Sequence, residues 1–180
     1  LSSFAYLLGL FLLLLSCLDL RGPVKNVQIK ISDQKTIILI DSSLSMLTED
    51  VKPNRFNKAI MIARDFVKKS IGHKISVVVI SDIQKRVVPF TDDLDLLESR
   101  LSALEKNQNL KGSSNMVSAI SESLKYFLLE DKRNDSRGNL IVISDFETNE
   151  RFSSLAVSNS ITAAFIGVGT AKGAPIPIRN

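Results

Sequence analysis

Four unbroken runs of mostly aliphatic residues recur along the chain beyond its first 34 residues. They occupy residues 36–40, 76–80, 139–143 and 162–167. A strand with one buried face alternates apolar and polar residues, whereas a strand covered on both faces is apolar throughout, as in parallel sheets. The runs therefore predict buried strands of a largely parallel sheet.

Between these runs, apolar residues recur at steps of three and four, which predicts helices at residues 56–67, 94–104 and 117–128. Gly72 is placed to stop the first helix, and Asp92 and Asp93 carry charges that suit the start of the second. Ser114 or Asn115 is expected to cap the third.

Two shorter segments complete the pattern. Residues 86–89 predict an edge strand, and Pro89 is expected to end it because proline has no N–H to donate. Residues 130–138 are charged and predict a loop. Strands that alternate with helices predict an α/β fold, a doubly wound, Rossmann-like and mostly parallel sheet, over residues 35–180.

The chain opens differently, with an apolar run of 15 residues at 4–18 that only Gly9 and Ser16 interrupt. Its lack of a polar face argues against a buried core helix. We expect a hydrophobic membrane segment at residues 1–20, although a spanning helix needs about 20 apolar residues. A cleaved signal segment, which would lack its basic start, and a lipoprotein signal acylated at Cys17 stay open. Residues 21–34 predict a linker with a short strand at 27–31.

Composition narrows the classes of function. The 180 residues include 23 Lys+Arg and 19 Asp+Glu, a net charge of +4 that is scattered along the chain, which argues against a nucleic-acid surface. The absence of Trp argues against base stacking. A single Cys17 excludes an internal disulfide and a cysteine zinc site, and a single His73 disfavours His-dependent catalysis.

Five oxygen-bearing side chains are expected where strands end or a helix begins: Asp41, Ser43, Ser45, Ser114 and Asp145. Ligands bind outside the carboxyl ends of the strands in such sheets, so these oxygens are expected to share a site. An all-oxygen set suits a hard cation, Mg²⁺, with Mn²⁺ or Ca²⁺ as alternatives. Turn or helix-capping chemistry is the simpler alternative for the Asp-x-Ser-x-Ser segment.

Spacing adds to this hypothesis. Ser43 and Ser45 are two residues apart, so in an extended loop their hydroxyls point the same way, together with Asp41. If neutral hydroxyls bound the cation directly and the carboxylates acted through water, the cation would lack negative charge. It would then take an acidic residue from a partner protein.

The five residues resemble the metal-ion-dependent adhesion site of von Willebrand factor A domains. Residues 45–55 and 167–177 resemble the bacterial aerotolerance (Bat) proteins, in which a hydrophobic helix precedes the A domain. The resemblance implies that Ser43 and Ser45 bind the cation directly and that Ser114 replaces the usual Thr. It implies that Asp41 and Asp145 act through water.

The resemblance also implies a protein of the bacterial inner membrane with a periplasmic A domain, whereas the basic residues after the apolar run favour a cytoplasmic flank. Bat proteins are encoded beside MoxR-type ATPases and one another, which implies a heteromeric complex connected with stress tolerance. Two departures stand out. Phe146 replaces the usual Gly and resists a left-handed turn. The family continues with a strand, a helix and a second membrane segment, so the C-terminal part is expected to be incomplete.

Other functions were weighed against this one. A haloacid-dehalogenase-like phosphatase needs a carboxylate where Ser43 stands, and a serine hydrolase needs a base, whereas His73 is expected far from the strand ends. We therefore expect no enzyme. A degenerate A domain without metal, acting as a structural interaction module, is the alternative. The remaining acidic residues near the rim are expected to be surface carboxylates: Glu49, Asp50 and Glu147.

Overall fold

The computed structural model describes residues 2–17, 34–81, 83–108, 110, 112, 115–130, 138–147 and 160–177. The chain divides into two compact units, Leu1–Lys30 and Ile31–Asn180. The strand predicted at 27–31 and most of the loop predicted at 130–138 lie outside the described residues.

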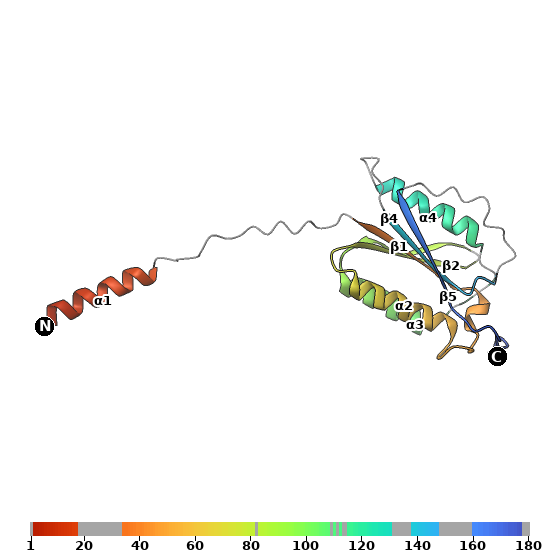
Figure 1. Cartoon of the computed structure of the whole chain (residues 1–180), viewed down its shortest axis with the longest axis horizontal. Coiled ribbons are helices and arrows are strands. Elements are labelled where there is room, and N and C mark those ends of the chain that lie inside the picture. Colours follow the sequence, from red (N-terminus) through yellow and green to blue (C-terminus); the bar gives the residue numbers. More distant parts are fainter. Residues whose placement is uncertain are drawn as a thin grey trace. The chain divides into compact units, whose positions relative to one another are not determined.

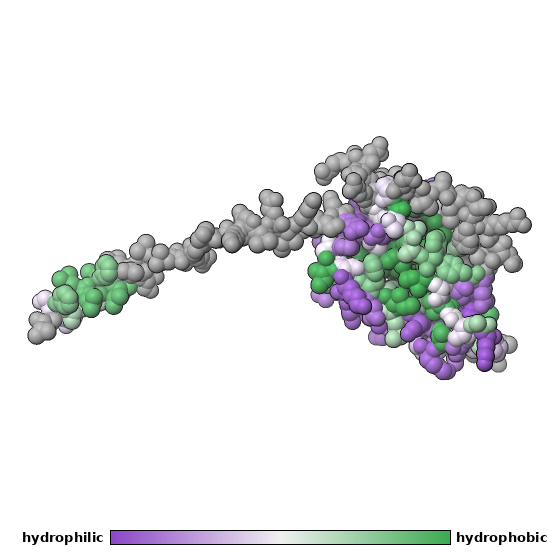
Figure 2. All heavy atoms as spheres, viewed as in Figure 1, coloured by the Kyte–Doolittle hydropathy of each residue, from purple (hydrophilic) through white to green (hydrophobic). Residues whose placement is uncertain are grey.

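The first unit contains the expected apolar helix, α1 (Ser2–Cys17). Its side chains from residue 3 to residue 13 are exposed, and Figure 2 shows them as a largely hydrophobic surface. Phe4 is 73% exposed and Tyr6 80% exposed. In the part of the chain that the structure describes, no helix has both the length and the hydropathy needed to cross a bilayer.

The second unit is built on a five-stranded sheet in the order β3-β2-β1-β4-β5 (Figure 1). Its strands are β1 (Lys35–Asp41), β2 (Lys74–Ile80), β3 (Lys85–Thr91), β4 (Gly138–Ser144) and β5 (Ile161–Gly167). All neighbouring pairs are parallel except β2 with β3. The mostly parallel sheet predicted from the apolar runs is confirmed, and β1 is its central strand.

Helices cover both faces of the sheet. Figure 1 shows α2 (Arg55–Lys69) and α3 (Leu94–Lys106) on one face and α4 (Met116–Glu130) on the other. Side-chain oxygens cap all three amino ends, because Asn54, Asp93 and Asn115 each accept from the backbone N–H three residues on. Of the two predicted caps of α4, Asn115 therefore makes the bond. Gly72, with φ of 82°, lies in the turn that follows α2.

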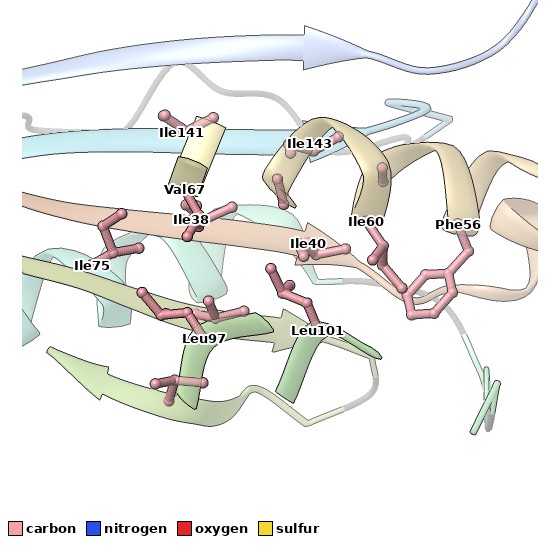
Figure 3. Close-up of a cluster of buried hydrophobic side chains, with 14 of the residues drawn as sticks. Ile38, Ile40, Phe56, Ile60, Val67, Ile75, Leu97, Leu101, Ile141 and Ile143 are labelled. Carbon is pink, nitrogen blue, oxygen red and sulfur yellow. The ribbon is translucent and has the colours of Figure 1, made fainter. Parts of the chain in front are cut away.

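The core explains why β1 is apolar at successive positions. Successive side chains of a strand point to opposite faces, so Ile38 and Ile40 pack beneath α2 and α3, whereas Ile37 and Leu39 pack on the α4 side. Figure 3 shows Ile38 and Ile40 among side chains from α2, α3 and the neighbouring strands. All four β1 side chains are fully buried, and burial of each stabilises the fold by about 1.5–3 kcal/mol.

The two edges of the sheet differ from the sequence pattern. β3 is an edge strand as predicted, but Pro89 does not end it, and the strand continues to Thr91. A register irregularity between Val88 and Thr91 accommodates Pro89, since proline is tolerated at edge strands and bulges. At the other edge, β5 has the apolar sequence of a covered strand, yet Phe165 is 51% exposed.

Candidate metal centre

The candidate site lies where β1 and β4 end side by side. The two strands are parallel and Ile40 pairs with Ile143, so Asp41 at the end of β1 lies beside Ser144 at the end of β4. β1 also marks the point where the strand order reverses, since β2 pairs with it on one side and β4 on the other. Ligand sites of doubly wound sheets form at this point.

Hydrogen bonds from Ser43 and Ser144 hold Asp41 at the carboxyl end of β1. Its Oδ1 accepts from the Ser43 backbone N–H at 2.9 Å, and its Oδ2 accepts from the Ser144 hydroxyl at 2.6 Å. The residue is 2% exposed. These bonds fix the direction of both carboxylate oxygens at the carboxyl end of β1.

Ser43 and Ser45 bring their hydroxyls together, with the two Oγ atoms 3.0 Å apart. Ligands about 2.1 Å from Mg²⁺ at adjacent corners of an octahedron are separated by about 3 Å. The hydroxyl pair therefore has the spacing of two neighbouring ligands. The loop is not extended as predicted, because Leu44–Leu47 forms a short 3₁₀ helix, η1, directly after the extended Ser43.

Two further contacts hold this loop in place. Ser42 bonds to the Ile80 carbonyl through its N–H at 2.7 Å and its hydroxyl at 2.6 Å, which ties the loop to the end of β2. The Leu44 N–H donates to the Gly112 carbonyl at 3.3 Å, which brings the loop before α4 to the rim. Ser114 belongs to that loop but lies outside the described residues.

Asp145 follows Ser144, and its side chain is 4% exposed. Its Oδ1 accepts from the Glu147 N–H at 3.2 Å, and its Oδ2 accepts from Nη1 of Arg55 at 2.9 Å. The structure thus joins Asp41, Ser43 and Ser144 directly, and it places Asp145 one residue beyond the end of β4. In that position an ion pair holds Asp145.

Arg55 is the residue that the sequence analysis missed. Its Nε and Nη2 reach the two carboxylate oxygens of Asp50 at 2.9 and 3.0 Å, and its Nη1 also binds Glu147 at 2.6 Å. Asp50 raises the pKa of Arg55 above its ordinary value, and Arg55 lowers the pKa of Asp50 below its usual range. One guanidinium therefore pairs with three carboxylates, and Asp145 is one of them.

The expectation that all three acidic residues are surface carboxylates is wrong for Asp50. Its side chain is 2% exposed, whereas those of Glu49 and Glu147 are 51% and 57% exposed. A signal was present in the sequence: Arg55 directly follows the helix-capping Asn54, where the helix dipole disfavours a cation. A nearby carboxylate offsets this unfavourable interaction, and Asp50 provides one.

Phe146 adopts the left-handed conformation that its side chain resists, with φ of 54°. The cost is about 1–2 kcal/mol. Its ring packs edge-on against Phe165 with centroids 6.0 Å apart, and its N–H donates to the Ser144 hydroxyl at 2.9 Å. An aromatic pair contributes about 0.5–1.5 kcal/mol beyond the burial of its area, which offsets much of the strain.

Two observations limit the chemistry of the site. His73 lies in the turn before β2, at the amino end of that strand. It is therefore far from the carboxyl ends of the strands, as predicted. Among the described residues, no group of three or more His, Cys, Asp or Glu is arranged to hold a metal ion.

The sequence matches a family model described as the von Willebrand factor type A domain, over residues 36–147. Among curated proteins, none matches the chain.

Solved structures are similar over most of the chain. BatB from Bacteroides thetaiotaomicron has a TM-score of 0.70 and 28% identity, with 81% of this chain and 71% of that chain covered. An aerotolerance-related membrane protein from Bacteroides fragilis NCTC 9343, with multiple mutations to serines, has a TM-score of 0.69 and 27% identity, with 81% and 72% covered. The manganese-loaded TRAP protein of Plasmodium vivax has a TM-score of 0.62, with 77% and 58% covered. Because only 19% of its residues are identical, this similarity shows a shared fold and nothing more.

Proposed function

Because the chain belongs to the von Willebrand factor type A domain family, we propose that it is a membrane-anchored binding module. Its site holds a divalent cation and recruits a partner protein, whose acidic side chain completes the metal shell. Mg²⁺ is the first choice of metal, with Mn²⁺ or Ca²⁺ as alternatives. The module binds and does not catalyse.

The observation that carries this proposal is the hydroxyl pair of Ser43 and Ser45 beside the buried Asp41. The two hydroxyls, with Ser114 as a third, would hold the cation directly, and Asp41 and Asp145 would act through bound water. A bound cation supplies an electrophilic centre for an acceptor oxygen. Since its direct protein ligands are neutral, a carboxylate from the partner would be the first negatively charged ligand.

The likeness to two Bacteroides proteins, one described as BatB and the other as an aerotolerance-related membrane protein, supports the cellular setting. We assign residues 1–20 to a membrane segment, 21–34 to a linker and 35–180 to the A domain, on the periplasmic side of a bacterial inner membrane. Other Bat proteins and a MoxR-type ATPase are the proposed members of the complex.

Two observations favour a second candidate, an A domain without metal that acts as a structural interaction module. Asp145 is already paired with Arg55, and Phe146 occupies a strained position in the same loop. This candidate requires partner binding that is indifferent to chelators, whereas the first requires that EDTA abolish it.

The test measures the melting temperature of the full chain in detergent, in EDTA and in millimolar Mg²⁺ or Mn²⁺. A ligand at about 100 times its Kd stabilises the folded state by about 2.7 kcal/mol, so the metal should raise the melting temperature. Asp41→Ala should abolish the shift, and Ser121→Ala, an exposed position on α4, should keep it. An unchanged melting temperature, or a shift that persists in Asp41→Ala, would contradict the metal site.

A further inference from the structure

The first residue of α2 is a buried cation. The Arg55 side chain is 3% exposed, although it stands at the helix amino end, where the dipole is already positive. Burial of an Arg is tolerated only when carboxylates pair with it. Its position therefore depends on acidic side chains brought from other segments.

Those side chains come from two loops at the carboxyl ends of the strands. Asp50 precedes α2 and accepts from Nε and Nη2, while Asp145 and Glu147 follow β4 and both accept from Nη1. The ion pair of Asp145 joins the cluster to the candidate metal site, because Ser144, the preceding residue, donates to Asp41.

A third loop fixes the guanidinium in place. The Asp50 Oδ2 also accepts from the N–H and hydroxyl of Thr170, at 2.8 and 3.0 Å, in the segment after β5. Gly169 lies so close that an added Cβ would be 3.2 Å from the Arg55 Nε, and its φ of 151° favours glycine. Arg55 is therefore held on several sides and has little freedom to swing away when a cation arrives.

We infer that Arg55 is a fixed internal counter-cation that weakens the binding of divalent metal at the neighbouring site, by neutralising Asp145. This inference rests on the proposed function. A hydrated ion that shares Asp145 meets a guanidinium bound to the same carboxylate, so like charges oppose its entry. The carboxylate of a partner then supplies negative charge in place of Asp145, whose charge is paired with Arg55. Arg55 thereby lowers metal occupancy when no acidic partner is bound.

The test measures the Kd of Mn²⁺ alone by calorimetry, with the full chain in detergent. Arg55→Gln should bind Mn²⁺ about tenfold more tightly, which corresponds to about 1.4 kcal/mol of removed repulsion. Arg55→Lys keeps the positive charge but loses the paired bonds to Asp50. Because the inference depends on the charge, its Kd for Mn²⁺ should stay within about threefold of the wild type. A purely structural Arg55 would give the opposite result, because loosening the loops weakens binding.

Arg64→Gln is the matched control. Arg64 lies on the same helix and pairs with two carboxylates, Glu98 and Glu105, but both belong to α3. The same loss of charge at this position should leave the Mn²⁺ affinity unchanged. If Arg55→Gln does not fold, the combined change with Asp50→Asn removes the buried pair without leaving Asp50 charged, and it should show the same tightening.

The outcomes separate the inference from the proposed function. Wild-type binding with equal or weaker binding in Arg55→Gln overturns the inference and leaves the metal site standing. No binding by the wild type, with binding by Arg55→Gln, supports the inference and contradicts the metal-loaded function of the natural chain. If neither binds, both are overturned.

Discussion

Arg55 and Arg64 stand on the same helix, and each pairs with more than one carboxylate, but their surroundings differ. The Arg55 side chain is 3% exposed, and its partners come from loops up to 92 positions away along the chain. The Arg64 side chain is 21% exposed, and its partners Glu98 and Glu105 lie on the single helix α3. One cluster joins loops at the candidate site, and the other joins two packed helices.

The difference shows that the effect of an Arg–carboxylate pair on the free energy of folding depends on how deeply the pair is buried. At Arg64, water and salt can replace either partner, so the pair adds little to the free energy of folding. At Arg55, neither the guanidinium nor the Asp50 and Asp145 carboxylates can return to water while the loops stay closed. Loss of one member then leaves a buried charge without its partner.

The largest effect is therefore expected for Arg55→Met. Removing one partner of a buried ion pair costs about 3–5 kcal/mol, and Arg55→Met should lower the free energy of unfolding by about 3 kcal/mol. Urea denaturation of the full chain in detergent measures it. A loss below about 1 kcal/mol would mean that Arg55 behaves like a surface residue and that the contrast with Arg64 is wrong.

A smaller effect, dependent on pH, is expected for Asp50→Asn. The pKa of Asp50 is lower in the folded state because Arg55 bonds to the charged form. The stability that the ionised Asp50 adds to the folded state is present in full above the unfolded pKa of about 3.9. It is lost as the pH falls toward the lower pKa of the folded state. The wild type should exceed Asp50→Asn in stability at pH 7 and pH 5, and the gap should shrink below about pH 4.

Urea titrations at pH 7, 5 and 3 measure this gap. The control is the same substitution in an Arg55→Met background, where the main cause of the lowered pKa of Asp50 is gone and only the Thr170 hydrogen bonds still lower it, so the pH dependence of the gap should become smaller. A wild-type gap that stays constant down to pH 3 would show that the bond to Arg55 does not set the titration of Asp50.

The smallest effect is expected for Arg64→Gln. Partly exposed ion pairs contribute about 0–1 kcal/mol, so the free energy of unfolding should fall by less than about 1 kcal/mol, and added salt should reduce the difference. Denaturation at low and high ionic strength checks both points. A salt-independent loss as large as that of Arg55→Met would remove the distinction between the two clusters.

Most of the fold could be predicted from local pattern. The runs at 36–40, 76–80 and 139–143 coincide with β1, β2 and β4, because a strand buried on both faces needs apolar residues at nearly every position. The run at 162–167 coincides with β5, although that edge strand is only partly buried. The end of β3 was mispredicted at Pro89, since whether a proline ends a strand depends on the irregular pairing with β2. No local sequence pattern predicts that irregular pairing.

The candidate site was predicted in part. Asp41, Ser43 and Ser45 lie within five residues of one another, and their contacts are local. The role of Ser144 as a donor to Asp41 depends on two strands 103 positions apart meeting in one register. The assignment of Ser114 to the site stays a prediction.

By itself, the sequence determined which segments become strands and helices, and it set oxygen-bearing side chains at the strand ends, because periodicity and capping act over a few residues. The tertiary structure decided which of the acidic residues near the rim is buried and which cation it meets. Asp50 and Glu147 look alike in the sequence, yet one is enclosed and the other is largely exposed. Burial and charge pairing depend on which distant loops close over Arg55, and that is a property of the assembled fold.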